Sequence, residues 1–376
     1  MCDDGNDVPG DGCTPGCTYV PGEVAWTVTI DDAWVDMVDV AVDATGRTIV
    51  ALSILTESTF EDPMATVLVA YGPDGERLWN RQWNFEPKDA ERPAAIATDA
   101  GGDIYLAGHT PSAVFARKYS RDGELKWETL VPRGGDDRLV ARDIVVADGG
   151  VFVLTDDGTG LNQDEHNVCV LRRLDAATGG MVWAMEPSTM NIVFCNGLAH
   201  DGSQIIVAGG ADWSPTSPLV VAVDLDGAQR WSLFDPEIAG SWLAAGASPQ
   251  GNVVLTGFAA AGDHADHRVA AFNSDGTPLW ADIIGTTSSD NSAKASVLVD
   301  AEGRALVAIT IREVDDPWGL YGSFSRHNAT GGLLWTTEFR AESELLINAA
   351  AAGPHFAVAV GRILPHVGWV RRYNLE

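Results

Sequence analysis

The sequence predicts an all-β protein: a seven-bladed β-propeller with four antiparallel strands per blade and an N-terminal strand that closes the last blade. Two repeated phrases and a match between the chain ends predict this fold. The first phrase, as in YGPDGERLW and FNSDGTPLW, recurs about every 50 residues and ends at a tryptophan. Its Asp or Asn can bond the following backbone and its Gly can take positive φ, so each copy predicts a hairpin. With one tryptophan near the N-terminus, the set is Trp26, Trp79, Trp127, Trp183, Trp231, Trp280 and Trp335.

The second phrase falls between successive tryptophans and has seven copies, such as IATDAGGDIYLAGHT and GASPQGNVVLTGF. Each copy has two apolar strands around a tight turn. The first of the two strands is rich in small residues, which suits an innermost strand crowded around an axis. Examples are Ala95, Gly197, Ala245 and Ala349. Together the two phrases predict four strands per blade.

The chain ends predict how the ring closes. The final residues WVRRYNLE match FARKYSRDG, but the chain stops before a following tryptophan strand. Residues 23–30, EVAWTVTI, match LKWETLV and supply that strand. We therefore expect residues 23–30 to be the outer strand of the last blade, which hides both sheet edges. A large apolar area can be buried by each tryptophan, so the tryptophan ring is interpreted as packing between blades and not as a ligand site.

Composition excludes several classes of function. The 376 residues include 53 acidic and 24 basic side chains, a net charge of −29 that would repel nucleic acid. No apolar run is long enough to cross a bilayer. We expect two regions, a cysteine-rich head at residues 1–22 and a propeller at residues 23–376, in a protein that is a monomer.

The propeller phrases resemble quinoprotein-like and related bacterial seven-bladed propeller repeats over nearly the whole of residues 23–376. LDAATGGMVW, from Leu174 to Trp183, is similar to the tryptophan-docking motif of those propellers. The resemblance implies either a cofactor-dependent dehydrogenase or a secreted or lipoprotein scaffold without chemistry. The fold alone does not choose between them.

The head CDDGNDVPGDGCTPGC closely resembles the myxobacterial cysteine-rich repeat. That resemblance implies an extracytoplasmic protein, secreted, at the cell surface or an outer-membrane lipoprotein, with a cysteine partner upstream, since three cysteines cannot all pair internally. No basic segment followed by an apolar one opens the chain, so any export signal lies further upstream or is absent. The residues that carry the match are Cys2, Asp3, Asp4, Gly5, Asn6, Gly10, Asp11, Gly12, Cys13 and Cys17.

No familiar catalytic motif is found in the sequence. A quinone-dependent enzyme would need cationic and carboxylate groups in the central funnel, whereas the inner strands carry mainly small residues. Arg142 and Lys294 are the main basic exceptions. We therefore expect a protein that is not an enzyme and needs no cofactor, with a quinoprotein-like or glycan-active enzyme that uses the funnel as the alternative.

Two segments have ligands that suit metals. Asp263, His264, Asp266 and His267 lie in a predicted loop and could bind zinc, although a solvated loop gathers such residues equally well. In the head, the oxygen atoms of Asp3, Asp4, Asn6 and Asp11 are ligands that suit calcium. The alternative is that these side chains only hydrogen-bond to the backbone of nearby turns.

The cysteines outside the head, Cys169 and Cys195, fall on two successive predicted blades. A disulfide would suit an exported protein. Because the two strands need not be neighbours, two buried thiols are the expected state.

The connections predicted at one face are long and irregular, and those at the other are short and repetitive. Irregular loops on a rigid scaffold usually carry function. Acidic and aromatic residues gather in the irregular loops, so we expect that face to bind a basic protein or a carbohydrate. The alternative is that these loops are only solvated, because acid is abundant everywhere. The candidate residues are Glu61, Asp62, Asp156, Asp157, Asp164, Trp213, Asp315, Asp316, Trp318 and Tyr321.

Overall fold

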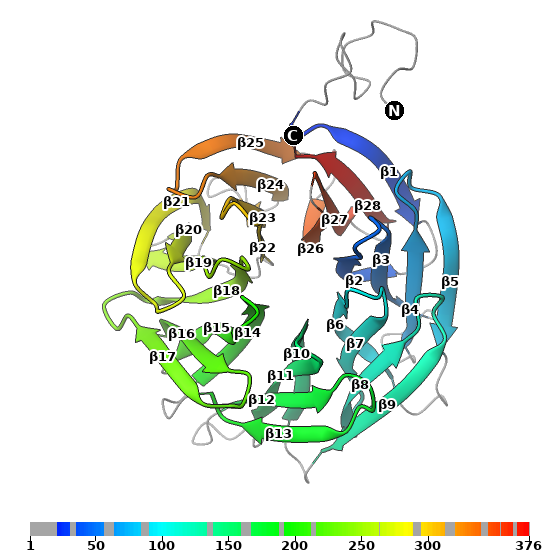
Figure 1. Cartoon of the computed structure of the whole chain (residues 1–376). Coiled ribbons are helices and arrows are strands. Elements are labelled where there is room, and N and C mark those ends of the chain that lie inside the picture. Colours follow the sequence, from blue (N-terminus) through cyan, green and yellow to red (C-terminus); the bar gives the residue numbers. More distant parts are fainter. Residues whose placement is uncertain are drawn as a thin grey trace, which may run out of the picture.

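The computed structural model forms a ring of seven four-stranded antiparallel sheets around a central axis (Figure 1). The predicted seven-bladed propeller is therefore confirmed. The residues it describes are 21–30, 35–55, 64–83, 90–133, 138–158, 167–187, 192–211, 216–262, 264–288, 295–312, 320–339, 345–353, 355–363 and 367–375.

The two inner strands of each blade carry most of the buried apolar residues. The innermost strands are β2 (Val35–Val42), β6 (Arg92–Thr98), β10 (Arg138–Ala147), β14 (Ile192–His200), β18 (Gly240–Ala247), β22 (Ala295–Val299) and β26 (Leu345–Ala352). The second strands are β3 (Thr48–Leu55), β7 (Ile104–His109), β11 (Gly150–Gly158), β15 (Gln204–Ala211), β19 (Val253–Ala261), β23 (Ala305–Arg312) and β27 (Phe356–Ile363).

The two outer strands form the circumference. The third strands are β4 (Met64–Tyr71), β8 (Ala113–Tyr119), β12 (Asn167–Asp175), β16 (Ser217–Asp224), β20 (His264–Phe272), β24 (Leu320–His327) and β28 (Val367–Asn374). The outermost strands are β5 (Arg77–Trp83), β9 (Leu125–Pro132), β13 (Met181–Met185), β17 (Gln229–Phe234), β21 (Pro278–Ser288), β25 (Leu333–Phe339) and β1 (Val24–Ile30). We number the blades 1 to 7 from the one that contains β2 to the one that contains β26.

The ring closes as predicted, because β1 is the outer strand of blade 7. Its sheet has the order β1-β28-β27-β26, and Val28 of β1 lies opposite Val370 of β28. Gly22 extends the contact, since its N–H donates to the carbonyl oxygen of Asn374 at 2.7 Å. The first and last strands of the propeller are thus joined in one sheet.

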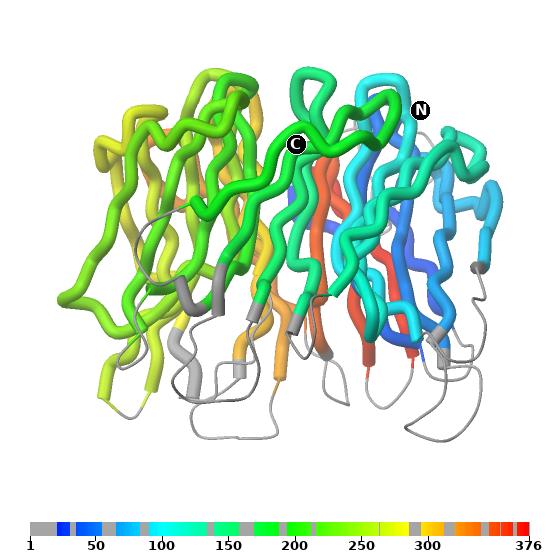
Figure 2. Tube along the Cα trace, turned by 90° about the horizontal axis from the view of Figure 1, so that it is seen from below, coloured from blue at the N-terminus to red at the C-terminus, as the bar shows by residue number. Residues whose placement is uncertain are grey.

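Tight turns join the first strand to the second, and the third to the fourth, and they lie along one rim, the upper one in Figure 2. Glycines with positive φ occupy these turns, for example Gly75 and Gly123. We term this the tight-turn rim. We term the opposite rim the loop-side rim. There the second strand of each blade leads to the third, and the fourth strand leads to the next blade.

Each predicted tryptophan docks on the next blade. Trp127 of blade 2 packs against Gly179 in a turn of blade 3, where an added Cβ would lie 2.7 Å from the indole ring. The indole N–H of Trp127 donates to the carbonyl oxygen of Ala176 in the same turn, at 3.1 Å. The other tryptophan and glycine pairs are Trp26 with Gly75, Trp79 with Gly123, Trp183 with Gly227, Trp231 with Gly276, Trp280 with Gly331 and Trp335 with Gly22.

Polar side chains on the innermost strands join neighbouring blades near the axis. Three of them accept a backbone N–H of the next blade: Asp39 from Ile96, Asp143 from Leu198 and Ser296 from Ala350. Two asparagines donate instead to a backbone carbonyl of the next blade: Asn196 to Trp242 and Asn348 to Met37. Within the described residues, such hydrogen bonds therefore join neighbouring blades at five of the seven blade junctions around the axial channel.

We predict that Trp127→Ala lowers the free energy of unfolding by about 2 to 4 kcal/mol, because it removes packing and a hydrogen bond between blades 2 and 3. Leu125→Ala is the matched control on the same strand: Leu125 is 49% exposed, and its loss should cost no more than about 0.5 kcal/mol. Chemical denaturation measures both. Equal effects of the two substitutions would contradict the docking role.

Candidate functional site

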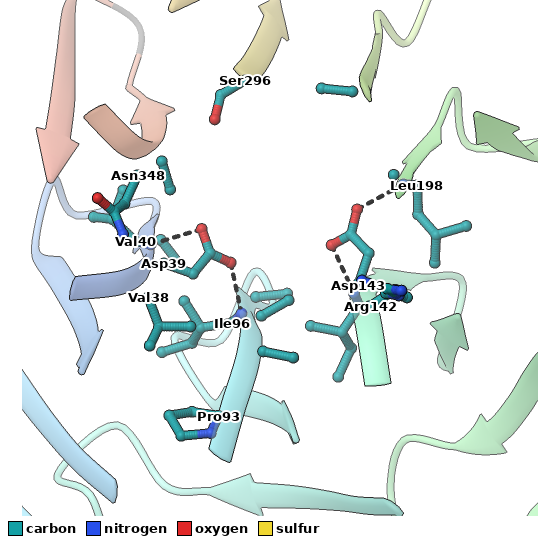
Figure 3. Close-up of a pocket in the computed structure, with 18 of the residues that line it drawn as sticks. Val38, Asp39, Val40, Pro93, Ile96, Arg142, Asp143, Leu198, Ser296 and Asn348 are labelled. Atoms are coloured by element: carbon teal, nitrogen blue, oxygen red, sulfur yellow. Dashed lines mark hydrogen bonds between the residues drawn. The ribbon is translucent and has the colours of Figure 1, made fainter. Parts of the chain in front are cut away.

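The strongest candidate site is the cavity on the propeller axis. It has a volume of about 1270 Å³ and is lined by the innermost strands of all seven blades (Figure 3). Most of the wall is small or apolar, including Ala95, Gly197, Ala245 and Ala349, as the sequence predicted. The described lining contains no Trp, Phe or Tyr.

Charged groups occupy only one side of this wall. Blades 7, 1, 2 and 3 supply all of the charged or titratable side chains of the described lining: Asp36, Asp39, Arg92, His109, Arg142, Asp143 and Arg362. Blades 4, 5 and 6 supply none. They present apolar residues such as Leu198, Leu243 and Val297, together with the uncharged polar side chains of Asn196 and Ser296. The cavity is therefore divided into an ionic arc and an uncharged, mostly apolar arc, which we term the apolar arc.

Asp39 and Asp143 face the cavity from two blades, and backbone N–H groups hold both (Figure 3). Asp143 accepts from Ile144 at 2.7 Å and from Leu198 at 2.6 Å. Removal from water raises the pKa of Asp143 to about 7, and the nearby charge of Asp39 adds to the rise, while the two backbone bonds oppose it. Both carboxyl groups are thus fixed in place by the strands.

Three guanidinium groups line the cavity: Arg92 and Arg362 at loop-side ends of strands, and Arg142 at a bulge in the middle of β10. Arg142 donates through Nη2 to Asp156 at 2.7 Å. Arg362 lies 3.7 Å from Asp36, with both side chains partly exposed. Arg92 is exposed and has no ion pair or hydrogen bond among the contacts of the described chain.

Sequence reasoning found Arg142 but missed Arg92 and Arg362, and Lys294 lies outside the described residues. The signal that could have identified Arg92 and Arg362 is the position of each residue along its strand. Arg92 opens an innermost strand and Arg362 stands next to last in a second strand, so both fall at the loop-side end of the wall. A charged residue at such an end can reach the channel, because the strand there is nearest to its mouth.

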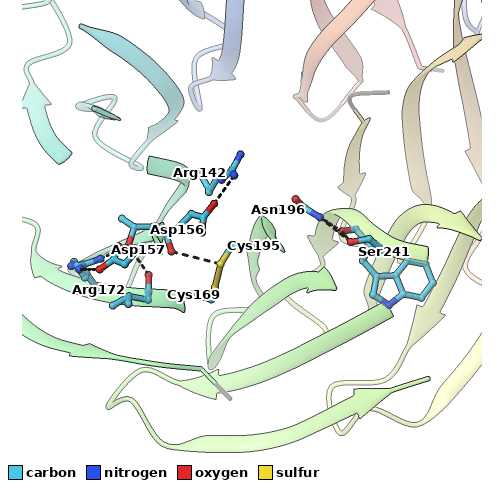
Figure 4. Close-up of a disulfide and its surroundings, with 11 residues drawn as sticks. Arg142, Asp156, Asp157, Cys169, Arg172, Cys195, Asn196 and Ser241 are labelled. Atoms are coloured by element: carbon cyan, nitrogen blue, oxygen red, sulfur yellow. Dashed lines mark hydrogen bonds and ion pairs between the residues drawn. A yellow bond between two sulfur atoms is a disulfide. The ribbon is translucent and has the colours of Figure 1, made fainter. Parts of the chain in front are cut away.

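Two predicted loop residues, Asp156 and Asp157, lie instead in strand β11. The side chain of Asp156 is 1% exposed and pairs with Arg142. Arg172 donates to Asp157 at 2.7 Å (Figure 4). These carboxylates therefore hold strands and the cavity wall together, and the prediction that they stand in a loop is wrong.

Cys169 and Cys195 form a disulfide, so the expectation of two thiols is wrong (Figure 4). That expectation assumed that the two strands need not be neighbours. In fact β12 of blade 3 packs against β14 of blade 4, and the two Cα atoms are 5.8 Å apart, within disulfide range. Both residues are buried in one apolar cluster. The disulfide is a covalent link between two blades, next to the Arg142–Asp156 pair.

We predict that reduction of this disulfide, or the double substitution of Cys169→Ala and Cys195→Ala, lowers the free energy of unfolding by about 3 kcal/mol. The reason is that the bond closes a loop with a sequence separation of 26 residues, which restricts the unfolded chain. Denaturation of the wild-type protein with and without a reductant measures the effect, and the double variant, which should not respond to the reductant, is the control. An unchanged midpoint in reduced wild-type protein would refute the prediction.

The residues proposed as metal ligands, His264, Asp266 and His267, belong to strand β20 and not to a loop. Alternation along the strand separates them: His264 and Asp266 are partly exposed, whereas His267 is fully buried. Asp263 lies outside the described residues. Within the described part of the chain, no group of three or more His, Cys, Asp or Glu side chains is placed to hold a metal.

His267 gives a pH prediction instead. Burial lowers its pKa to about 4, and neither ring nitrogen has a hydrogen-bond partner among the described residues. Because the folded pKa lies below the unfolded value of about 6.5, the neutral ring is favoured and stability is lost as the pH falls from about 6.5 to about 4. Over that range the loss from this group is about 3 kcal/mol.

The measurement is the free energy of unfolding at pH 7 and pH 4. His267→Leu should remove that part of the acid loss, whereas His264→Leu, on the partly exposed face of the same strand, should keep it. If both variants lose stability as the wild type does, His267 is not the acid-sensitive group.

Most of the other predicted site residues lie outside the described residues: Cys2, Asp3, Asp4, Asn6, Asp11, Cys13, Cys17, Glu61, Asp62, Asp164, Trp213, Asp315, Asp316 and Trp318. Tyr321 is described, and it lies in β24, half-buried against an apolar cluster of blades 5 and 6. The head and its division from the propeller therefore stay predictions.

Comparison with known proteins gives one family match. Residues 63–231 match the family described as outer membrane protein assembly factor BamB. That span covers strands of blades 1 to 4, so these blades are similar in sequence to BamB-type repeats. No curated protein matches the chain.

Solved structures share the fold at very low identity. Quinohemoprotein alcohol dehydrogenase from Comamonas testosteroni is 10% identical, with a TM-score of 0.53 over 94% of this chain and 76% of that one. The ulvan lyase of a polysaccharide lyase family is 9% identical, with a TM-score of 0.53 over 91% and 94% of the two chains. Drosophila Plexin A in complex with Semaphorin 1b is 9% identical, with a TM-score of 0.51 over 95% and 88%. Likeness at this level shows the propeller fold alone.

The similarity to BamB-type repeats and the Cys169–Cys195 disulfide both favour an extracytoplasmic protein. No helix in the described part of the chain could cross a bilayer.

The cavity does not fit a quinone cofactor of the kind that the dehydrogenase likeness implies. A planar aromatic anion needs flat side chains to stack on and several available cations. The described lining has no Trp, Phe or Tyr, and two of its three arginines are already paired with carboxylates.

Proposed function

We propose that this protein is an exported, non-catalytic binding scaffold that holds a protein or carbohydrate partner at its loop-side rim. The observation that carries the proposal is the asymmetry of the two rims. Tight turns with glycines at positive φ crowd one rim, so the longer connections leave the strands at the other, where some short connections also lie, such as the turn at Gly262 between β19 and β20. Variable connections on a rigid ring are the usual place for recognition.

Three further observations support a binding role. The ring is closed by β1, and hydrogen bonds join neighbouring blades near the axis. A disulfide also links blades 3 and 4, so the ring is a rigid platform. The matched family is named for an assembly factor, and one solved structure that shares the fold is a complex of Plexin A with Semaphorin 1b. The connection at residues 56–63 and that at residues 313–319 are rich in acid, which suits a basic partner.

The alternative is an enzyme that uses the axial cavity, as the dehydrogenase and lyase likenesses would allow. The chemistry of the described wall argues against it. Asp39 and Asp143 both accept backbone N–H groups that hold the blades together, so proton transfer by either would disturb the ring. Because these carboxylates already accept backbone N–H groups, we do not propose that they bind calcium. The prediction that the head binds calcium is unaffected.

The test is partner capture by charge reversal at each rim. The loop-side variant carries Glu61→Lys, Asp62→Lys, Asp315→Lys and Asp316→Lys. The control carries Asp74→Lys, Asp122→Lys, Asp226→Lys and Asp275→Lys, all exposed residues of tight turns. Each immobilised protein is incubated with an envelope extract of the producing cells, and the bound material is quantified by mass spectrometry.

A component retained by the wild type and by the tight-turn control, but reduced at least about tenfold by the loop-side variant, supports the proposal; that factor corresponds to about 1.4 kcal/mol. Equal capture by both variants, or no specific component on the wild type, would remove the loop-side rim as the binding surface.

A further inference from the structure

The charge that remains available in the axial cavity is positive, although the chain as a whole is strongly acidic. The whole protein carries a net charge of −29. Inside the cavity, however, both oxygens of Asp39 and of Asp143 already accept backbone N–H groups. Asp36 lies beside Arg362, and Arg142 is paired with Asp156. Among the charged groups of the described lining, Arg92 is the one with no ion pair or hydrogen bond to another described residue.

Arg92 is well placed to receive an anion. It opens β6 at the loop-side end of the wall, and its cross-strand neighbour His109 also lines the cavity. Arg142 and Arg362 each add a buried Nε with no hydrogen-bond acceptor among the described residues. A guanidinium group presents a planar fork of donors that matches a carboxylate through two parallel bonds.

The opposite wall suits an apolar group. Blade 5 contributes Leu243, Ala244 and Ala245 to the lining, and blade 6 contributes Val297 and Leu298. Leu243 stands at a bulge of β18, at the position that Arg142 occupies in β10. A cavity of about 1270 Å³ has room for a small organic molecule.

We propose that the axial cavity binds a small amphipathic carboxylate, with its anionic end on Arg92 and its apolar body against blades 4 to 6. This site differs from the loop-side rim and needs no macromolecular partner, so it goes beyond the function proposed above.

The experiment uses three ligands of the same shape and different charge: phenylacetate, 2-phenylethanol and phenethylamine. Calorimetric titration of the whole protein at pH 7 should show that phenylacetate binds about tenfold or more tightly than the other two, which matches the strength of one charge-assisted contact. Arg92→Gln should abolish this preference. Arg230→Gln, an exposed arginine on outer strand β17, is the matched control and should leave it unchanged.

A second variant tests the apolar arc. Leu243→Ser should weaken all three ligands together and preserve their order, because it alters the wall that contacts the shared ring. Equal binding of the three ligands by the wild type, a preference that survives Arg92→Gln, or no binding of phenylacetate at all would each overturn the proposal. The comparison within the wild type decides the charge preference even if a variant is unstable.

Discussion

Contact between neighbouring blades is the constraint on which the rest of the molecule depends. A single four-stranded sheet exposes two apolar faces, and each blade can cover them only by packing on its neighbours. The outer tryptophans fix this contact at the circumference, where the absence of a side chain on the turn glycine lets the indole ring approach the backbone. Side chains such as Asp143 and Asn196 fix it near the axis. The shape of the axial cavity follows from this arrangement.

One backbone position in the cavity wall is filled differently from blade to blade and contributes to the difference between its two sides. The bulge in the innermost strand carries Arg142 in blade 3, Asn196 in blade 4 and Leu243 in blade 5. The strands around these bulges pair in nearly the same way, so the repeat supplies the geometry and the individual residue supplies the chemistry. A repeated fold can thus build a polarised site without any irregular element.

Local sequence signals were enough to predict the blades, the tryptophan ring and the closing strand. Turn chemistry acts over a few residues, and the phrase that ends at Trp127 or Trp280 shows it directly. Strand ends were harder. Asp156 and His264 look like loop residues, yet pairing with the adjacent strand keeps both within a sheet. The disulfide depended on which face of β12 meets β14, and the roles of Arg92 and Arg362 depended on strand register. These are tertiary facts that a single sequence does not display.

Closure by β1 also fixes where the ends of the propeller leave the molecule. Gly22 and Asn374 are hydrogen-bonded partners at the tight-turn rim. A tether or neighbouring domain attached at either end would therefore depart from the rim opposite the loop-side rim. Held in this way, the ring would turn its longer connections and its arginine-bearing entrance outward, away from whatever surface anchors it.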